Sequence, residues 1–412
     1  RYSVVCNAIT IPDFFSRRFH DQKNILMCIS AIIILIFFIP YTASGFKAVG
    51  TLFNSLFGFD YHVSMIAGAA IIIGYTVLGG FLAVSTTDLI QSVVMSIALI
   101  IIVFFGIHVA GGWDAVISNA QSLAGYLSMT SMHNMADHTS SPYSLLTICS
   151  TLAWGLGYFG MPHILLRFMA IEDENKLTLS RRIASVWVVI SMFVAILIGI
   201  IGYSASVAGS VPMLSTSSQS ETIIIQLSGL LGQNGFLLSI IAGIVLAGIL
   251  ASTMSTADSQ LLTAASGISQ NLLQDFLKIK MDTKTSMRAA RLTVIGIALV
   301  AVVLAWNPDS SVFTIVSFAW AGFGASFGPV MLFALFWKRS NLPGAIAGMV
   351  AGGVMVFVGN MASSLWAVSG ESTNCSRHSW WPVRQSSSFP WPLQHLPRKS
   401  AISSIPSGNN RT

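Results

Sequence analysis

Long apolar runs constrain the fold of this chain more than any other feature. Residues 32–39, 71–78 and 97–107 are almost wholly apolar and lie inside longer stretches of the same character. Such stretches are too long and too apolar for the core helices of a water-soluble domain. Only 9% of the 412 residues are charged, whereas soluble domains carry roughly 25%. These observations exclude an ordinary soluble protein and indicate a membrane protein.

Nine segments of about 20 mostly apolar residues stand between polar breaks. Lipid offers backbone groups no water, so spans of this length are expected to be α-helices, and no ten-residue alternation typical of a membrane barrel is present. The sequence therefore predicts an all-α polytopic membrane protein. The predicted spans are 25–46, 63–84, 89–110, 144–169, 183–208, 236–263, 290–306, 312–337 and 344–366.

The distribution of basic residues predicts the orientation of these spans. Lys and Arg concentrate in loops that stay cytoplasmic. The connections before span one and after spans four, six and eight hold most of the bases, whereas the other side, up to residue 366, holds only Lys47. The pattern predicts a cytoplasmic N-terminal segment over 1–24. It also assigns most of the formal charge of +6 to topology, so no nucleic-acid partner is expected.

The remaining composition adds two expectations. Cys6, Cys28, Cys149 and Cys375 show no CxxC spacing, so neither a metal cluster nor a disulfide framework is indicated. A transmembrane domain is predicted over 25–366. The segment 367–412 is rich in Trp, Pro and Ser without either periodicity, and we expect it to be disordered.

Span four carries three glycines and a proline at membrane depth, in the sequence Trp-Gly-Leu-Gly-Tyr-Phe-Gly-Met-Pro-His of residues 154–163. Gly155, Gly157 and Gly160 weaken an unbroken helix, and Pro162 interrupts its hydrogen bonds. The span could be a discontinuous helix whose backbone binds a solute, as in transporters. It could also be a glycine-packed helix crossing with a proline kink.

The end of span six presents hydroxyl groups on one helical face, from Ser252, Ser255 or Thr256, and Ser259. Hard cations take oxygen ligands, so these hydroxyls and nearby carbonyls could hold Na⁺. Interhelical hydrogen bonding is the alternative. Asp258 follows in the same helix, where solvation or a salt bridge near the cytoplasmic end could account for it.

Two further polar residues have competing explanations. Asp88 lies between spans two and three, where it could cap the N-terminus of span three or assist cation binding. Tyr41, near the outer end of span one, could belong to the aromatic belt or face a buried substrate. His163 and Arg167 are each single, and Arg167 falls where a cytoplasmic base is expected.

Taken together, these stretches resemble the sodium:solute symporter family, in particular its bacterial proline-transporting members. The resemblance covers about residues 5–360. It rests on residues 7–15 (Asn-Ala-Ile-Thr-Ile-Pro-Asp-Phe-Phe), 79–85 (Gly-Gly-Phe-Leu-Ala-Val-Ser), 154–158, 254–256, 317–325 (Ser-Phe-Ala-Trp-Ala-Gly-Phe-Gly-Ala) and 344–349 (Gly-Ala-Ile-Ala-Gly-Met).

The resemblance implies a LeuT-like inverted-repeat fold with alternating access around a midplane site, incomplete here with about nine helices. By the same likeness, Tyr41, Trp154 and Tyr158 contribute to proline binding. Ser255 and Thr256 ligate the co-transported Na⁺, and Asp88 is tied to sodium coupling. The implied activity is Na⁺-coupled symport across a bacterial inner membrane, with no organic cofactor and no enzymatic step.

Departures from the family pattern leave alternatives open. Met161 stands where proline-transporting members usually show glutamine in Gly-Gln-Pro-His, so pantothenate or another small organic solute is an alternative substrate. The family has helices before the first one here, so we expect impaired transport, and the likeness stops near Asn360. A membrane solute sensor is disfavoured because the longest interior loop, 264–289, is too short for an output domain. An intramembrane enzyme is disfavoured as well, because it would need paired acids or a Ser/His pair at one depth, and the sequence shows neither.

Overall fold

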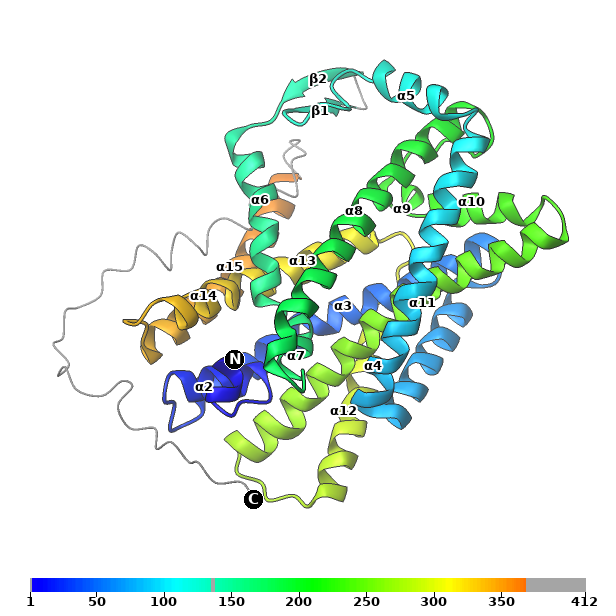
Figure 1. Ribbon diagram of the computed structural model, residues 1–412. Helices are drawn as coiled ribbons and strands as arrows, with labels where there is room; N and C mark the ends of the chain where they lie inside the picture. The colour runs from blue at the N-terminus through cyan, green and yellow to red at the C-terminus, as the bar shows by residue number, and fades with distance from the viewer. Residues whose placement is uncertain (1, 135–137, 368–412) are drawn as a thin grey trace.

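The computed structural model of the chain describes residues 2–134 and 138–367, and within 362–367 only the backbone. The described part is almost entirely helical, with one small β-hairpin (Figure 1). The elements in chain order are α1 (Tyr2–Val5), α2 (Ile11–Arg18), α3 (Ile25–Phe57), α4 (Tyr61–Val109), α5 (Trp113–Ser122), β1 (Ser131–Asn134), β2 (Thr139–Pro142), α6 (Leu145–Gly160), α7 (Pro162–Met169), η1 (Glu174–Lys176), α8 (Leu177–Val207), α9 (Ser217–Ser220), α10 (Ile223–Gly232), α11 (Phe236–Ser266), η2 (Gly267–Phe276), α12 (Thr283–Leu304), α13 (Val312–Ser326), α14 (Gly328–Phe336) and α15 (Leu342–Ala367).

The apolar runs form the long helices, as expected for a multi-pass membrane protein. Among the described residues, 7 helical segments are long and apolar enough to cross a membrane. Predicted spans two and three share one of these segments, and predicted span four is divided between α6 and α7. The nine predicted spans therefore all fall on helices, although the helices are not divided as the sequence suggested.

The helix α4 contains two arms that meet at Gly80. Gly80 has φ 62° and ψ −166°, which are non-helical values, and glycine reaches positive φ without a Cβ clash. In Figure 1 the first arm is blue and the second is cyan. The turn between the second and third spans was expected at residues 85–88, and this prediction was wrong. Asp88 consequently lies inside the second arm, so the predicted capping role is excluded.

The helix α3 runs through the middle of the molecule and contacts α4, α11, α12, α13, α15 and η2. Its buried face includes Phe37, Phe38 and Phe46, which join Phe323 and Phe327 in the main apolar cluster. A second cluster lies between the second arm of α4, α8, α10 and α11. The first cluster positions α3, α11 and α13 relative to one another, and these helices carry most of the candidate site.

The N-terminal segment folds against this body. Thr10 caps α2, its hydroxyl accepting from the Asp13 amide, and it also donates to the Oδ1 of Asn271 in η2 at 3.0 Å. Phe14 and Phe15 of α2 are buried. The segment 368–412, most of the tail expected to be disordered, lies outside the described residues.

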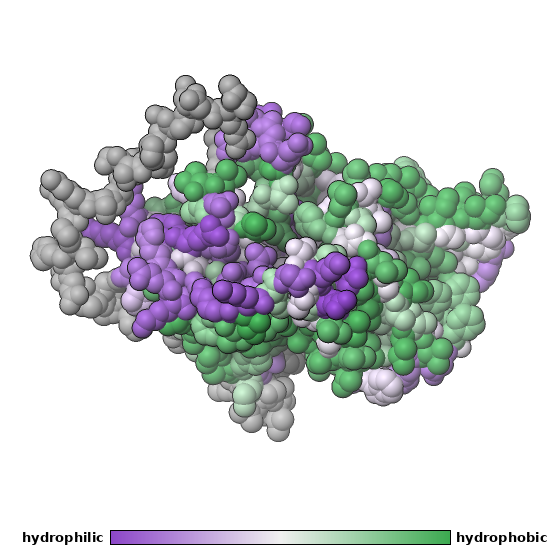
Figure 2. Space-filling view, turned by 90° about the horizontal axis from the view of Figure 1, so that it is seen from below, coloured by the Kyte–Doolittle hydropathy of each residue, from purple (hydrophilic) through white to green (hydrophobic). Residues whose placement is uncertain are grey.

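Hydrophilic residues gather at one end of the molecule. Figure 2 views the molecule from below the orientation of Figure 1, and it shows hydrophilic residues across the middle of that face with hydrophobic residues at its sides. The connection between η2 and α12, which carries exposed Lys278 and Lys280, lies at this lower end. The hairpin of β1 and β2 lies at the opposite end (Figure 1).

Candidate functional site

Three residues expected to bind solute, Tyr41 on α3 and Trp154 and Tyr158 on α6, converge on Trp320 of α13. The Trp320 Nε1 donates to the Tyr41 hydroxyl at 3.0 Å. The ring of Trp320 stacks against Trp154 with centroids 5.8 Å apart, and it meets the edge of Tyr158 at 4.9 Å. We call these four residues the aromatic cluster. Three helices that are distant in sequence thus bring the predicted residues together.

Helical spacing explains how α6 contributes two of these rings. Trp154 and Tyr158 are four residues apart and therefore lie on one face of the helix. Phe313 stacks on Trp154 with an interplanar angle of 5°. Trp320 was missed as a site residue by sequence reasoning, since a single tryptophan in an apolar run shows no spacing. Its only signal was the family-like stretch 317–325.

The three glycines of α6 differ in what surrounds them. A Cβ at Gly157 would lie 2.7 Å from the Trp320 ring, and one at Gly160 would lie 2.2 Å from the backbone oxygen of Phe323. At Gly155 no heavy atom lies within 4 Å of such a Cβ. Gly157 and Gly160 therefore allow α13 to approach α6 closely, which supports the packing interpretation for these two positions.

The expected discontinuity in span four is present at Met161. This residue is buried and extended, with φ −79° and ψ 107°, between the end of α6 and the start of α7. A helix end leaves its last four carbonyls without helical partners, and a helix start leaves its first N–H groups free. Here the carbonyls belong to Gly157 through Gly160. No side chain caps the start of α7, so backbone groups of both polarities meet at this break.

Ser255 and Thr256, the expected Na⁺ ligands, are partly buried on α11. Both hydroxyls donate to the carbonyl oxygen of Ser252, at 3.2 and 3.1 Å. A hydroxyl that donates its hydrogen keeps lone pairs for another partner. The arrangement is therefore compatible with binding a hard cation, and the assignment of the two residues stays a prediction.

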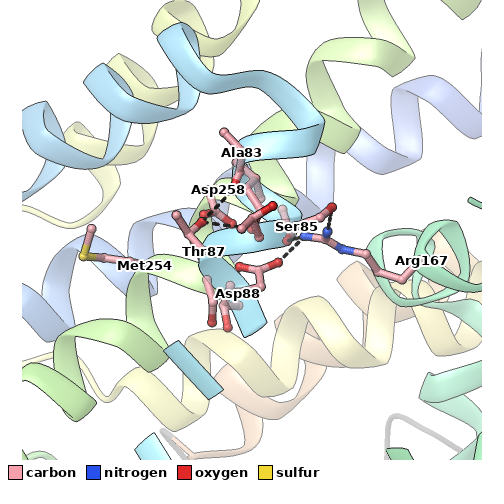
Figure 3. Close-up of polar contacts among 12 residues, drawn as sticks. Ala83, Ser85, Thr87, Asp88, Arg167, Met254 and Asp258 are labelled. Atoms are coloured by element: carbon pink, nitrogen blue, oxygen red, sulfur yellow. Dashed lines mark hydrogen bonds and ion pairs between the residues drawn. The ribbon is translucent and has the colours of Figure 1, made fainter. Parts of the chain in front are cut away.

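Asp88 lies in a polar cluster that the sequence did not reveal (Figure 3). Arg167 of α7 donates to the Asp88 carboxylate and to the Ser85 hydroxyl, both on α4. It also donates to the Ser259 hydroxyl of α11 at 2.6 Å. We call Ser85, Asp88, Arg167 and Ser259 the arginine cluster. Arg167 was interpreted as a topological charge, and the structure adds these specific partners.

Asp258 is buried and neighbours this cluster. Its Oδ2 accepts from the Tyr75 hydroxyl at 2.7 Å. The helix was expected to reach water near residue 263, but α11 continues into η2 as far as Phe276. Solvation at a helix end therefore does not account for Asp258. The partner that stabilises it is a neutral phenol from the first arm of α4.

The match to the sodium:solute symporter family extends over residues 1–352. The chain is 39% identical to a sodium/proline symporter of Staphylococcus aureus over 85% of its own length and 66% of that protein. It is 40% identical to the high-affinity proline transporter PutP of Bacillus subtilis over 85% of its own length and 71% of that protein. The chain thus spans about two thirds of the length of these curated relatives.

A solved structure shows the same fold. It is described as the substrate-bound outward-open state of a Na⁺-coupled sialic acid symporter, and it superimposes with a TM-score of 0.70 at 17% identity. The match covers 93% of this chain and 76% of that one. The expected LeuT-like fold is therefore confirmed, and with the family match over 1–352 it follows that this multi-pass membrane protein belongs to the sodium:solute symporter family.

Proposed function

We propose that the chain forms the body of a sodium-coupled symporter that carries proline across a bacterial inner membrane, with its N-terminus in the cytoplasm and without covalent chemistry. The observation that carries the proposal is the aromatic cluster. It gathers Tyr41, Trp154 and Tyr158 around Trp320, directly beside the break at Met161. Such a combination of ring surfaces and free backbone groups suits a small zwitterion.

Proline offers an apolar ring, a secondary ammonium and a carboxylate, and each has a fitting partner at this site. Aromatic faces attract both apolar rings and cations. The uncapped first turn of α7 presents free N–H groups and the positive end of the helix dipole, which favour a carboxylate. The carbonyls at the end of α6 can accept from the ammonium. The solute therefore binds across the break.

Sodium coupling requires a Na⁺ site whose occupancy changes the affinity of the solute site. The hydroxyls of Ser255 and Thr256 supply oxygen ligands without a permanent charge, which suits a weak and reversible Na⁺ site. Asp88 adds a negative charge nearby in the fold, on α4, which packs against α11. By linkage, Na⁺ and proline then raise each other's binding affinity by the same factor.

Uptake of labelled proline into transport-deficient cells that express the chain tests this proposal. The chain alone should show impaired uptake. With a family N-terminus restored to it, we expect uptake with an inward Na⁺ gradient, and loss of this uptake without the gradient or in Ser255→Ala/Thr256→Ala. Thr253→Ala is the matched control, because its hydroxyl lies on the same helix and bonds to Ile249 of that helix. Proline uptake that ignores Na⁺ would contradict the proposed coupling.

The methionine at position 161, in place of the glutamine usual in proline-transporting members, favours a different organic solute as the alternative substrate. Its buried thioether occupies the break itself, where a glutamine would offer hydrogen bonds. If Met161 excludes proline in favour of another organic solute such as pantothenate, proline should not compete for uptake of that solute. Met161→Gln should then raise the affinity for proline. Competition assays with the two solutes distinguish these cases.

A further inference from the structure

Arg167 joins three helices through one side chain. It lies in the last turn of α7, and its guanidinium donates to Ser85 and Asp88 on α4 and to Ser259 on α11. Its charge also lies 5.2 Å from the centroid of the Phe81 ring. In Figure 3 the arginine reaches from α7 toward Asp88 and Ser85. Among the contacts described for α7, this group fixes its end to the two neighbouring helices.

The ion pair between Arg167 and Asp88 is partly buried. The side chains are 29% and 23% exposed, respectively. The second carboxylate oxygen of Asp88, Oδ1, is buried and accepts no hydrogen bond from the described residues. A carboxylate has room for more than one donor or cation, and a buried acceptor left unused is costly. The arginine therefore satisfies Asp88 incompletely.

A second cation could not join Asp88 at little cost while the guanidinium remains. Two positive charges at about 4 Å repel strongly in a partly buried site. The proposed function gives Asp88 a part in sodium coupling, and the structure shows that the same carboxylate already holds a positive charge supplied by the chain itself. A Na⁺ ion that binds Asp88 would therefore compete with Arg167 for one carboxylate.

The position of Arg167 gives this competition a mechanical consequence. The helix α7 has 8 residues and begins at the break after Met161, so its first turn faces the solute region and its last turn carries Arg167. We propose that Arg167 is a tethered cation that Na⁺ displaces from Asp88, so that ion binding releases the last turn of α7 from α4 and α11. The proposal rests on the proposed function and adds a positioning residue to it.

Binding of ²²Na⁺ to the purified full chain in choline buffer tests the exchange without requiring transport. The readout is the component of binding that Asp88→Asn removes. We expect Arg167→Gln to lower the Na⁺ concentration for half-saturation by roughly tenfold, because a competing unit charge is lost from a partly buried site. Arg182→Gln, the same change at an exposed position of α8, should leave it unchanged.

The direction of the effect separates exchange from a structural role. Damage to a structural contact weakens Na⁺ binding, whereas removal of a competitor strengthens it. Unchanged or weaker binding in Arg167→Gln would overturn the proposal, as would an equal gain in the Na⁺ binding that remains in the Asp88→Asn background. If Arg167→Gln does not fold, Arg167→Lys provides the test. It keeps the charge but loses the planar fork, and its half-saturation should also fall below that of the wild type.

The same assay distinguishes failure of the exchange from failure of the proposed function. If Ser255→Ala/Thr256→Ala abolishes Na⁺ binding but Arg167→Gln leaves it unchanged, sodium coupling stands and the exchange is wrong. If Asp88→Asn removes no component of binding, the exchange is again wrong. If the wild-type chain binds no ²²Na⁺, both proposals fail.

Discussion

The aromatic cluster takes two residues from α6, before the break at Met161, and the arginine cluster takes Arg167 from α7, after the break. Different forces hold the two clusters together. In the aromatic cluster, ring contacts and one neutral hydrogen bond join Trp320 to its three neighbours. In the arginine cluster, a guanidinium joins a carboxylate and two hydroxyls. Neutral contacts of this kind depend little on ions in solution, whereas charge-assisted bonds are stronger and respond to competing ions.

This difference suggests that the two parts of the interrupted helix, α6 and α7, have different functions. Under the proposed function, the α6 side, with Trp154 and Tyr158, responds to the shape of an organic solute. Under the proposed exchange, the α7 side, with Arg167, responds to a cation. Because α6 and α7 meet at Met161, a displacement of either helix changes the positions of the backbone N–H and C=O groups at the break. Substitutions that disturb one cluster alone can therefore test how far the two responses are separate.

The largest effect is expected where α6 packs against the backbone of α13. In Gly160→Ala the new methyl would lie 2.2 Å from the backbone oxygen of Phe323, and backbone cannot rotate away as a side chain can. We expect a loss of about 2 kcal/mol or more in stability, read as a lower melting temperature, together with loss of proline uptake.

Gly155→Ala is the control for this prediction. It adds the same methyl on the same helix, but no heavy atom lies within 4 Å of it. Its stability should stay within about 0.5 kcal/mol of the wild type. Equal melting temperatures for the two variants would show that close packing of α6 on α13 does not matter.

In the arginine cluster, Asp88→Asn should cost about 1–3 kcal/mol, between the values for exposed and fully buried pairs. The reason is that a partly buried guanidinium loses its counter-charge. The melting temperature and the Na⁺ dependence of uptake should both change, while the affinity for proline at saturating Na⁺ should not. Asp282→Asn is the control, since Asp282 only caps α12 and asparagine caps equally well.

Trp320→Phe should affect the solute side alone, because phenylalanine keeps a ring but cannot donate to the Tyr41 hydroxyl. Loss of one neutral hydrogen bond costs about 1 kcal/mol. If this cost appears in the binding of proline, the half-saturation concentration should rise roughly fivefold, with that for Na⁺ unchanged. Tyr41→Phe removes the same bond, so the double variant should be no worse than either single one. Strict additivity, or a shift in Na⁺ dependence, would contradict this assignment.

The smallest effect is expected at Tyr158, which is 40% exposed and contacts Trp320 through its ring. Tyr158→Phe keeps the edge-to-face contact, so the stability should change by less than about 0.5 kcal/mol. Tyr158→Ala removes the contact and should cost about 0.5–1.5 kcal/mol. A large loss of proline affinity in Tyr158→Phe, without a loss of stability, would indicate that the hydroxyl itself contacts the solute.

The nine predicted spans all fall on helices, and one of the two interruptions was predicted. Each feature was predictable only as far as it leaves a signal in the sequence. Apolar length alone indicates a span. The cluster of glycines before Pro162 indicates a break, and one is found at Met161. The turn at Gly80 was misplaced because Ser85 through Asp88 look more like a loop than two glycines in an apolar run. Only the backbone geometry shows which of the two positions turns.

Sequence reasoning named candidate site residues but not their contacts, and their roles in binding solute or Na⁺ stay predictions. Tyr41, Trp154 and Tyr158 were expected from family likeness, and the structure shows that Trp320 joins them. The partners of Arg167 could not be predicted, because its nearest polar neighbours lie 79, 82 and 92 residues away in the sequence. The sequence gives the position of a charged residue, whereas its interaction partners are known only from the tertiary fold.

The reversal of α4 at Gly80 also bears on how the chain enters a membrane during synthesis. Between Tyr61 and Val109 the sequence contains no Lys or Arg, and Asp88 is its only charged side chain. This helical hairpin therefore carries no positive charge that could determine which side of the membrane its turn faces. The flanking basic segments must orient it. Arg167, made 79 residues after Asp88, reaches it only when α7 arrives.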